Sequence, residues 1–138
     1  MIRSVSRSDI GGLTTLLKTD IDVIQSQRFD SSAKIQSKYD CICVLKGAGT
    51  LVATEGGYIW LCQEGNPGMA TAGMGDVLSG VIGSLLCQGL APSDAAIVGV
   101  WLHSRAADLA VGDGGERGLL ASDLWCYLRR LVNDPYTG

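Results

Sequence analysis

The sequence predicts an α/β fold in which a few strands are followed by three helices. Residues 41–46, Cys-Ile-Cys-Val-Leu-Lys, form a short apolar run without alternation, as is typical of a strand that is covered on both faces. Beyond residue 74, apolar residues recur at the spacing of a helix. A chain of 138 residues is long enough to bury a core, and we expect one domain over residues 1–138.

The first part of the chain is predicted to be helical and fairly polar between residues 8 and 38. A second helix is expected within it, from Ser31 to Lys38. The apolar positions that form one stripe on the first helix are Leu13, Leu16, Leu17, Ile21 and Ile24.

Three strands are predicted in the middle of the chain. In the run 41–46, Cys41 and Cys43 are two residues apart and are expected on the same face of the strand. Glycines at 47 and 49 interrupt the run before a second strand at 50–54. Glu-Gly-Gly at 55–57 indicates a hairpin turn, which leads into a third strand at 58–62.

The last three helices are predicted from their starting residues. One begins near Gly75, a second follows Pro92-Ser93-Asp94, and Ser122-Asp123 cap a third. A loop is expected at 112–118, between the second and the third. The apolar face of the first of these helices is expected to comprise Val77, Leu78, Val81, Ile82, Leu85 and Leu86.

Composition narrows the classes of function. The net charge is −3 and the basic residues are scattered, which argues against nucleic acid as a partner. No apolar stretch reaches 18 residues, so we expect no membrane segment. No apolar stretch follows the first two arginines, so we expect no signal peptide. Both expectations favour a cytoplasmic location. The five cysteines show no Cys-x-x-Cys spacing and are interpreted as free thiols, without a metal site. His103, the single histidine, is interpreted as a packed helix residue.

The stretch Gly73-Met74-Gly75-Asp76 places glycines and one carboxylate at a predicted helix start. The first amides of a helix lack partners and favour anions, and glycines let a phosphate approach the backbone. Asp76 would be a carboxylate in the first turn, ready to accept a proton from a substrate hydroxyl beside a phosphate. An Asp in the first turn of an ordinary helix is the simpler alternative, because Gly-x-Gly-Asp alone is a weak signal.

The stretch Lys46-Gly47-Ala48-Gly49-Thr50 follows the predicted buried strand. Its glycines leave room for a ligand at the backbone, Lys46 supplies charge, and Thr50 supplies a hydroxyl. A tight turn between strands is the alternative, since the spacing matches neither a Walker A nor a dinucleotide-binding fingerprint. If both turns face the same nucleotide, the two motifs together indicate a nucleotide site far more specifically than either motif alone.

The two stretches Val44–Ala53 and Gly65–Leu86 together resemble the signature stretches of the ADP-dependent NAD(P)H-hydrate dehydratases, a branch of the ribokinase-like superfamily. The resemblance extends from about residue 13 to residue 133 and includes Leu102–Ala110 and Gly118–Leu124 in two later helices. It implies an α/β, partial ribokinase-like fold that corresponds to the C-terminal half of that domain.

The resemblance also implies an activity. The family dehydrates the hydrates of NADH and NADPH (NADHX and NADPHX) at the expense of ADP, or of ATP in its eukaryotic branch, and Mg²⁺ would arrive with the nucleotide. The hydroxyl of the hydrate would be phosphorylated, and loss of phosphate would restore the double bond. Asp76 would be the base and would contact the hydrate, beside Asn66. The residues implied in nucleotide binding are Lys46, Gly47, Ala48, Gly49, Thr50 and Gly75, with Gly73, Met74 and Gly75 as the anion hole.

The sequence departs from the family pattern before Leu13. The family carries Thr-Pro-His-Pro-Gly-Glu there, whereas this chain has Arg7-Ser8-Asp9-Ile10-Gly11-Gly12 and no counterpart of the histidine. A complete domain is also about twice as long, which predicts either a homo-oligomer or association with a missing N-terminal half. A small-molecule kinase of the same superfamily and a non-catalytic, nucleotide-binding half-domain are the alternative functions.

Overall fold

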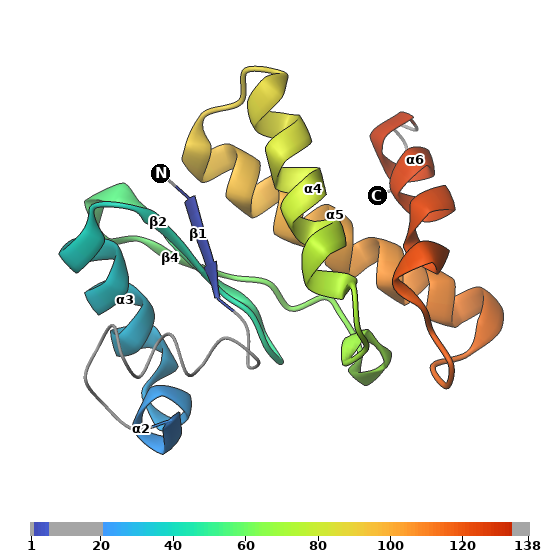
Figure 1. Cartoon of the computed structure of the whole chain (residues 1–138), viewed down its shortest axis with the longest axis horizontal. Coiled ribbons are helices and arrows are strands. Elements are labelled where there is room, and N and C mark those ends of the chain that lie inside the picture. Colours follow the sequence, from blue (N-terminus) through green and yellow to red (C-terminus); the bar gives the residue numbers. More distant parts are fainter. Residues whose placement is uncertain (1, 6–20, 134–138) are drawn as a thin grey trace.

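The computed structural model describes residues 2–5 and 21–133 of the chain, and Figure 1 shows their arrangement. Short 3₁₀ turns lie at Glu55–Gly57, Pro67–Met69 and Ala121–Asp123. The strands and helices are, in chain order, β1 (Ile2–Val5), α2 (Ile21–Ser26), α3 (Arg28–Tyr39), β2 (Ile42–Leu45), β3 (Leu51–Ala53), β4 (Ile59–Leu61), α4 (Met74–Cys87), α5 (Pro92–Gly114) and α6 (Leu124–Asn133).

One sheet contains all four strands in the order β1-β2-β3-β4. The three predicted strands are present as β2, β3 and β4, and β3 and β4 form the predicted hairpin, with Leu51 opposite Leu61. The strands β2 and β3 are also antiparallel, with Cys43 opposite Ala53. The sequence analysis placed no strand before the helices, which was wrong, because β1 pairs in parallel with β2 and sets Ile2 opposite Ile42. Four residues without alternation carry little local signal, and pairing with a distant strand defines this element.

The sheet is covered on both faces by helices (Figure 1). Every residue of β2 is buried, as the absence of alternation predicted. Cys41 and Cys43 lie on the same face, where they pack with Ile24 of α2 and Ile35 of α3. The α/β class and the two-sided covering of the central strand are therefore confirmed.

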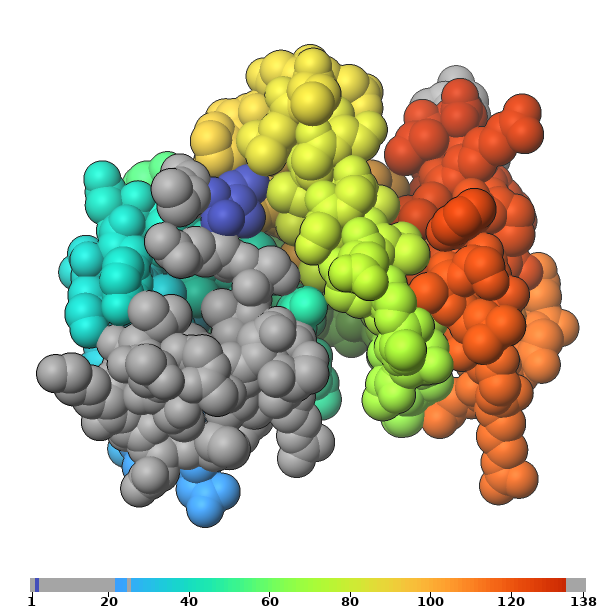
Figure 2. Space-filling view, in the orientation of Figure 1, coloured from blue at the N-terminus to red at the C-terminus, as the bar shows by residue number. Residues whose placement is uncertain are grey.

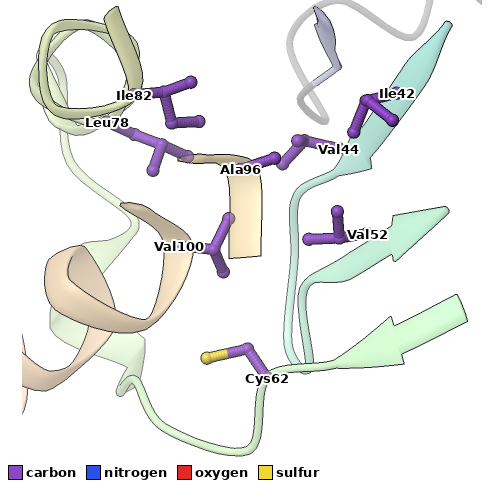
Figure 3. Close-up of a cluster of buried hydrophobic side chains, with 8 residues drawn as sticks. All are labelled: Ile42, Val44, Val52, Cys62, Leu78, Ile82, Ala96 and Val100. Carbon is purple, nitrogen blue, oxygen red and sulfur yellow. The ribbon is translucent and has the colours of Figure 1, made fainter. Parts of the chain in front are cut away.

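The opposite face of the sheet packs against α4 and α5. Val44 of β2 points towards Ala96 of α5, and Cys62 and Val100 belong to the same cluster (Figure 3). This core fixes the C-terminal end of β2 relative to the first turns of α4, and both motifs found in the sequence lie there. The buried members of the cluster are Ile42, Val44, Val52, Cys62, Leu78, Ile82, Ala96 and Val100.

Two helix boundaries differ from the prediction. Helix α3 begins at Arg28, three residues before the predicted start, and residues 8–20 of the first expected helix lie outside the described part of the chain. Helix α5 continues to Gly114, so residues 112–114 of the predicted loop are helical. Its end comes at Gly115, which has a φ of 86° and donates its N–H to the Val111 carbonyl at 2.8 Å.

The predicted apolar face of α4 is narrower than expected. Leu78 and Ile82 are buried together with Met74, whereas Leu86 is 37% exposed. Within the described ranges, no helix combines the length and the apolar character needed to cross a bilayer.

Helices α4 and α5 cross at a glycine. A methyl group on Gly99 would lie 2.6 Å from Cγ1 of the buried Ile82, so we expect Gly99→Ala to lower the free energy of unfolding by about 1–3 kcal/mol. Gly80→Ala on the open side of α4 is the matched control, because nothing lies within 4 Å of the added group and alanine favours a helix by about 0.5–1 kcal/mol. Urea denaturation of both variants measures the difference. Equal stability would contradict the tight crossing.

Candidate active site

The first turn of α4 begins at Gly73, whose φ of 86° lies in the left-handed region that favours glycine. Its carbonyl accepts hydrogen bonds from the amides of Asp76 and Val77, each at 3.0 Å. Gly73 therefore ends the preceding loop and starts the helix, and the amides of Met74 and Gly75, which precede these bonds, have no carbonyl partner within the helix. Asp76 is exposed on this turn, as its position in the sequence predicted.

The turn at residues 46–50 is held by an arginine that the sequence analysis missed. The guanidinium of Arg28, at the start of α3, donates to the carbonyls of Ala48 and Leu45, the latter at 3.2 Å. Burial lowers the pKa of Arg28, and two carbonyl acceptors compensate for part of that desolvation. Arg28 is far from the turn in sequence, so only the fold shows this contact.

The same turn requires glycine at its third residue. Gly49 has a φ of 66°, and a methyl group there would lie 2.9 Å from Cδ1 of Leu61. The hydroxyl of Thr50 donates to the Gly47 carbonyl at 3.3 Å, so this predicted ligand contact closes the turn in the free chain. Gly47 and Ala48 are exposed and remain accessible to a ligand.

The two glycine-rich turns meet through Lys46. A methyl group on Gly75 would lie 2.6 Å from the Nζ atom of Lys46, so the ammonium lies directly against the backbone of the first turn of α4. An ammonium and a helix N-terminus both favour an anion. The fold thus brings together two stretches whose contacting residues, Lys46 and Gly75, lie 29 positions apart in the sequence.

The loop that carries Asn66 is held by Asp108 of α5. Its carboxylate accepts the Gly65 amide at 2.9 Å and the Asn66 side-chain amide at 2.8 Å. The Oδ1 atom of Asn66 is buried and has no hydrogen-bond partner among the described residues. The side-chain bond of Asn66 goes to Asp108, and in the described part of the chain none joins it to Asp76 or Lys46. The predicted contact of Asn66 with substrate therefore stays a prediction.

Further contacts fix the remainder of this loop. The indole of Trp101 donates to Glu64 at 3.2 Å, which anchors the loop where it leaves β4. A methyl group on Gly68 would lie 2.8 Å from the Glu116 carbonyl, and one on Gly73 would lie 3.2 Å from Cβ of Ala121. The loop glycines therefore permit close packing against α5 and the segment after it.

His103 lies beneath the first turn of α4 and is 5% exposed. The pKa of its imidazole is lowered to about 4, first by burial and to a lesser extent by the Lys46 ammonium, while a hydrogen bond to the Met74 backbone acts in the opposite direction. The ring is therefore neutral at pH 7. The interpretation of His103 as a packed helix residue agrees with its burial, but its proximity to Lys46 was not foreseen.

The geometry provides an anion site with a carboxylate beside it. Backbone amides and an ammonium can hold a phosphate group, and Asp76 can accept a proton from a hydroxyl next to it. No group of three potential metal ligands occurs among residues 2–5 and 21–133.

Comparison with known proteins identifies the family. The Carb_kinase family model, described as NAD(P)H-hydrate dehydratase, matches residues 13–130. The chain belongs to this family.

Individual relatives agree with this result. The bifunctional NAD(P)H-hydrate repair enzyme of Coxiella burnetii is 50% identical over 123 residues, which are 89% of this chain and 25% of that protein. The ADP-dependent (S)-NAD(P)H-hydrate dehydratase of Neisseria meningitidis is 44% identical over 119 residues, which are 86% of this chain and 40% of that protein.

A solved structure confirms the fold. The ADP/ATP-dependent NAD(P)H-hydrate dehydratase from Bacillus subtilis, co-crystallised with ATP and Mg²⁺, superposes with a TM-score of 0.86 and 27% identity. The match covers 95% of this chain and 46% of that one. The chain thus spans less than half of the length of each relative named here.

The loop clamp at Asp108 can be tested by removing one acceptor. In Asp108→Asn an amide replaces one carboxylate oxygen, so one of the two loop bonds is lost, and we expect a loss of about 1–3 kcal/mol in the free energy of unfolding. Faster hydrogen exchange at the Gly65 amide would locate the change in the loop.

Asp113→Asn on the same helix is the control for this experiment. Asp113 accepts a hydrogen bond from the Tyr127 hydroxyl at 2.7 Å, and the amide oxygen of asparagine can accept it as well. Unchanged exchange at Gly65 in Asp108→Asn would show that the carboxylate does not hold the loop.

Proposed function

We propose that this chain carries the nucleotide site and the catalytic base of an ADP-dependent NAD(P)H-hydrate dehydratase. The observation that supports the proposal most directly is the contact of Lys46 with the backbone of Gly75, which unites the two glycine-rich turns. Membership of the dehydratase family agrees with it. The proposed substrates are NADHX or NADPHX, and ADP.

The proposed reaction has two steps. The hydroxyl of the hydrate attacks the terminal phosphorus of ADP, its proton passes to Asp76, and AMP leaves with the electrons of the broken P–O bond. Phosphate then leaves the phosphorylated intermediate with the C–O bonding electrons, a neighbouring C–H loses its proton, and the ring double bond is restored. The sum converts hydrate and ADP into NAD(P)H, AMP and phosphate, which balances because the water of the hydrate ends in phosphate.

The residues of this chain have separate roles in that reaction. The amides of Gly73, Met74 and Gly75 would stabilise the negative charge that grows on the transferred phosphoryl group. Lys46 supplies a positive charge, and the exposed backbone of Gly47 and Ala48 supports the proposed nucleotide contact. Mg²⁺ bound with the nucleotide would neutralise phosphate charge.

The remaining half of the site must come from outside the described residues. Strand β1 is at one edge of the sheet that the structure describes, and its other edge has no described strand beside it. On α4, a methyl group added to Gly80 or Gly83 would have no atom within 4 Å, so this side of the helix is open. Figure 2 shows α4, in yellow-green, on the face in view. We propose that residues 1–138 form one unit, the C-terminal half of a ribokinase-like domain, and that a further half of such a domain packs here.

A second copy of the chain is the alternative occupant of this surface. Light scattering of the purified 138-residue chain distinguishes the two. We expect a monomer that gains hydrate turnover when the N-terminal half of a related dehydratase is added. A stable dimer with turnover of its own would contradict a separate half-domain and would favour a homo-oligomer.

Gly75→Ala tests the nucleotide site. The added methyl group displaces the flexible end of Lys46 and little else, so stability should be retained while ADP affinity falls about tenfold or more. Calorimetric titration of ADP measures the change, with Gly80→Ala on the same helix as the control. Absence of ADP binding by the unaltered chain at millimolar concentration would contradict the proposed function.

Asp76→Asn tests the base in the presence of its complementary half. The amide accepts no proton, so we expect ADP affinity within about twofold of the original and turnover lowered by about 10²–10⁴-fold. Turnover is followed by the absorbance of the restored dihydronicotinamide. Full turnover in this variant would eliminate Asp76 as the base.

A further inference from the structure

Among the described residues, only two buried side-chain atoms lack a hydrogen-bond partner, and both belong to the site. They are Oδ1 of Asn66 and Nε2 of His103. A buried polar atom without a partner is costly and calls for an explanation, such as a ligand or a proton that completes its bonding. His103 is the more informative of the two, because its bonding capacity changes when it binds a proton.

The surroundings of His103 connect it to the anion site. The ring bonds to the backbone of Met74, whose amide belongs to the first turn of α4, and it lies in the field of Lys46. Lys46 in turn contacts the backbone of Gly75. An anion bound at this turn would therefore offset the charge that opposes protonation of the ring.

The other charged groups nearby are engaged elsewhere or exposed. Glu64 accepts the Trp101 indole, and Asp108 accepts the Gly65 and Asn66 amides. Asp76 lies exposed on the first turn of α4. Within the described part of the chain, Lys46 is thus the charged group that acts on the ring.

We propose that His103 is a positioning residue of the nucleotide site, which takes up a proton from solvent at Nε2 when a phosphate group binds beside Lys46. The charged ring attracts the bound phosphate, and its bond to the Met74 backbone is strengthened. Both effects hold the anion turn in its bound position. This inference rests on the proposed nucleotide site but not on the dehydration itself.

The proposal has a reciprocal consequence. If phosphate binding raises the pKa of His103, protonation of His103 must strengthen phosphate binding by the same factor. The effect appears below the pKa of the bound form, so ADP affinity should rise as the pH falls through that range. A shift of about two to three units corresponds to about 10²–10³-fold tighter binding by the protonated chain.

The single histidine of the chain makes the test direct. NMR titration of the labelled imidazole should give a pKa of about 4 in the free chain. Saturating ADP should raise that pKa by about two to three units, so that part of the imidazole is protonated near pH 7, whereas adenosine, which lacks phosphate, should leave it unchanged. In the free Lys46→Met chain the pKa should be higher, because the opposing charge is gone.

A pH profile of ADP affinity separates this role from packing alone. The ratio of the affinities of the original chain and His103→Asn should increase as the pH falls from 6 to 4, and the titration of the nucleotide itself cancels in that ratio. A constant ratio would overturn the proposal.

Each NMR outcome also decides a separate point. If the His103 pKa of the free chain is unchanged in Lys46→Met, the proposal is overturned, whether or not ADP binds. Calorimetric saturation with ADP without movement of the histidine pKa overturns it as well, and leaves the proposed nucleotide site intact. Absence of ADP binding contradicts the proposed function, and the Lys46→Met comparison then decides the inference.

Discussion

The site depends on the packing of α5 between the sheet and the two glycine-rich turns. The crossing at Gly99 permits α4 to lie against α5, and the next turn of α5 places His103 beneath the start of α4. Further along the same helix, Asp108 holds the loop of Asn66. Small residues make this approach possible, because Ala95, Ala96, Ala106 and Ala107 of α5 are all fully buried. A rigid helix thus positions a site that consists largely of backbone.

Much of the fold could be predicted from the sequence because its signals are local. The buried strand at 42–45 lacks alternation, and α4 begins where a glycine is followed by helical apolar spacing. The strand β1 and the extra turn of α5 could not be predicted in this way. Strand β1 exists because it pairs with β2, which is distant in the sequence. Helix α5 ends at Gly115, whose positive φ the sequence does not distinguish from that of the neighbouring glycines.

The candidate site shows the same division. The residues for which we propose a ligand contact, such as Gly73, Gly75 and Asp76, carry a motif that is visible in the sequence. The residues that hold those turns in place carry none, because an arginine or an aspartate on a helix has no distinctive pattern. Arg28 and Asp108 act through backbone carbonyls and amides far away in the sequence, and only the folded chain shows those partners.

An anion site that consists largely of backbone amides carries little positive charge of its own. The charged groups around the anion turn and its loop include Lys46, Asp76, Glu64 and Asp108, and the last two are engaged with loop or helix partners. Arg28 adds a positive charge behind the turn at 46–50, but its guanidinium is bound to backbone carbonyls. Attraction for phosphate must then come mainly from helix amides and the Lys46 ammonium, which is a modest charge for a nucleoside diphosphate. A buried histidine that gains a proton only when the anion arrives adds positive charge without requiring it in the free chain, where a second buried cation beside Lys46 would be costly. The neutral state of His103 in the free chain is therefore compatible with a role in holding phosphate.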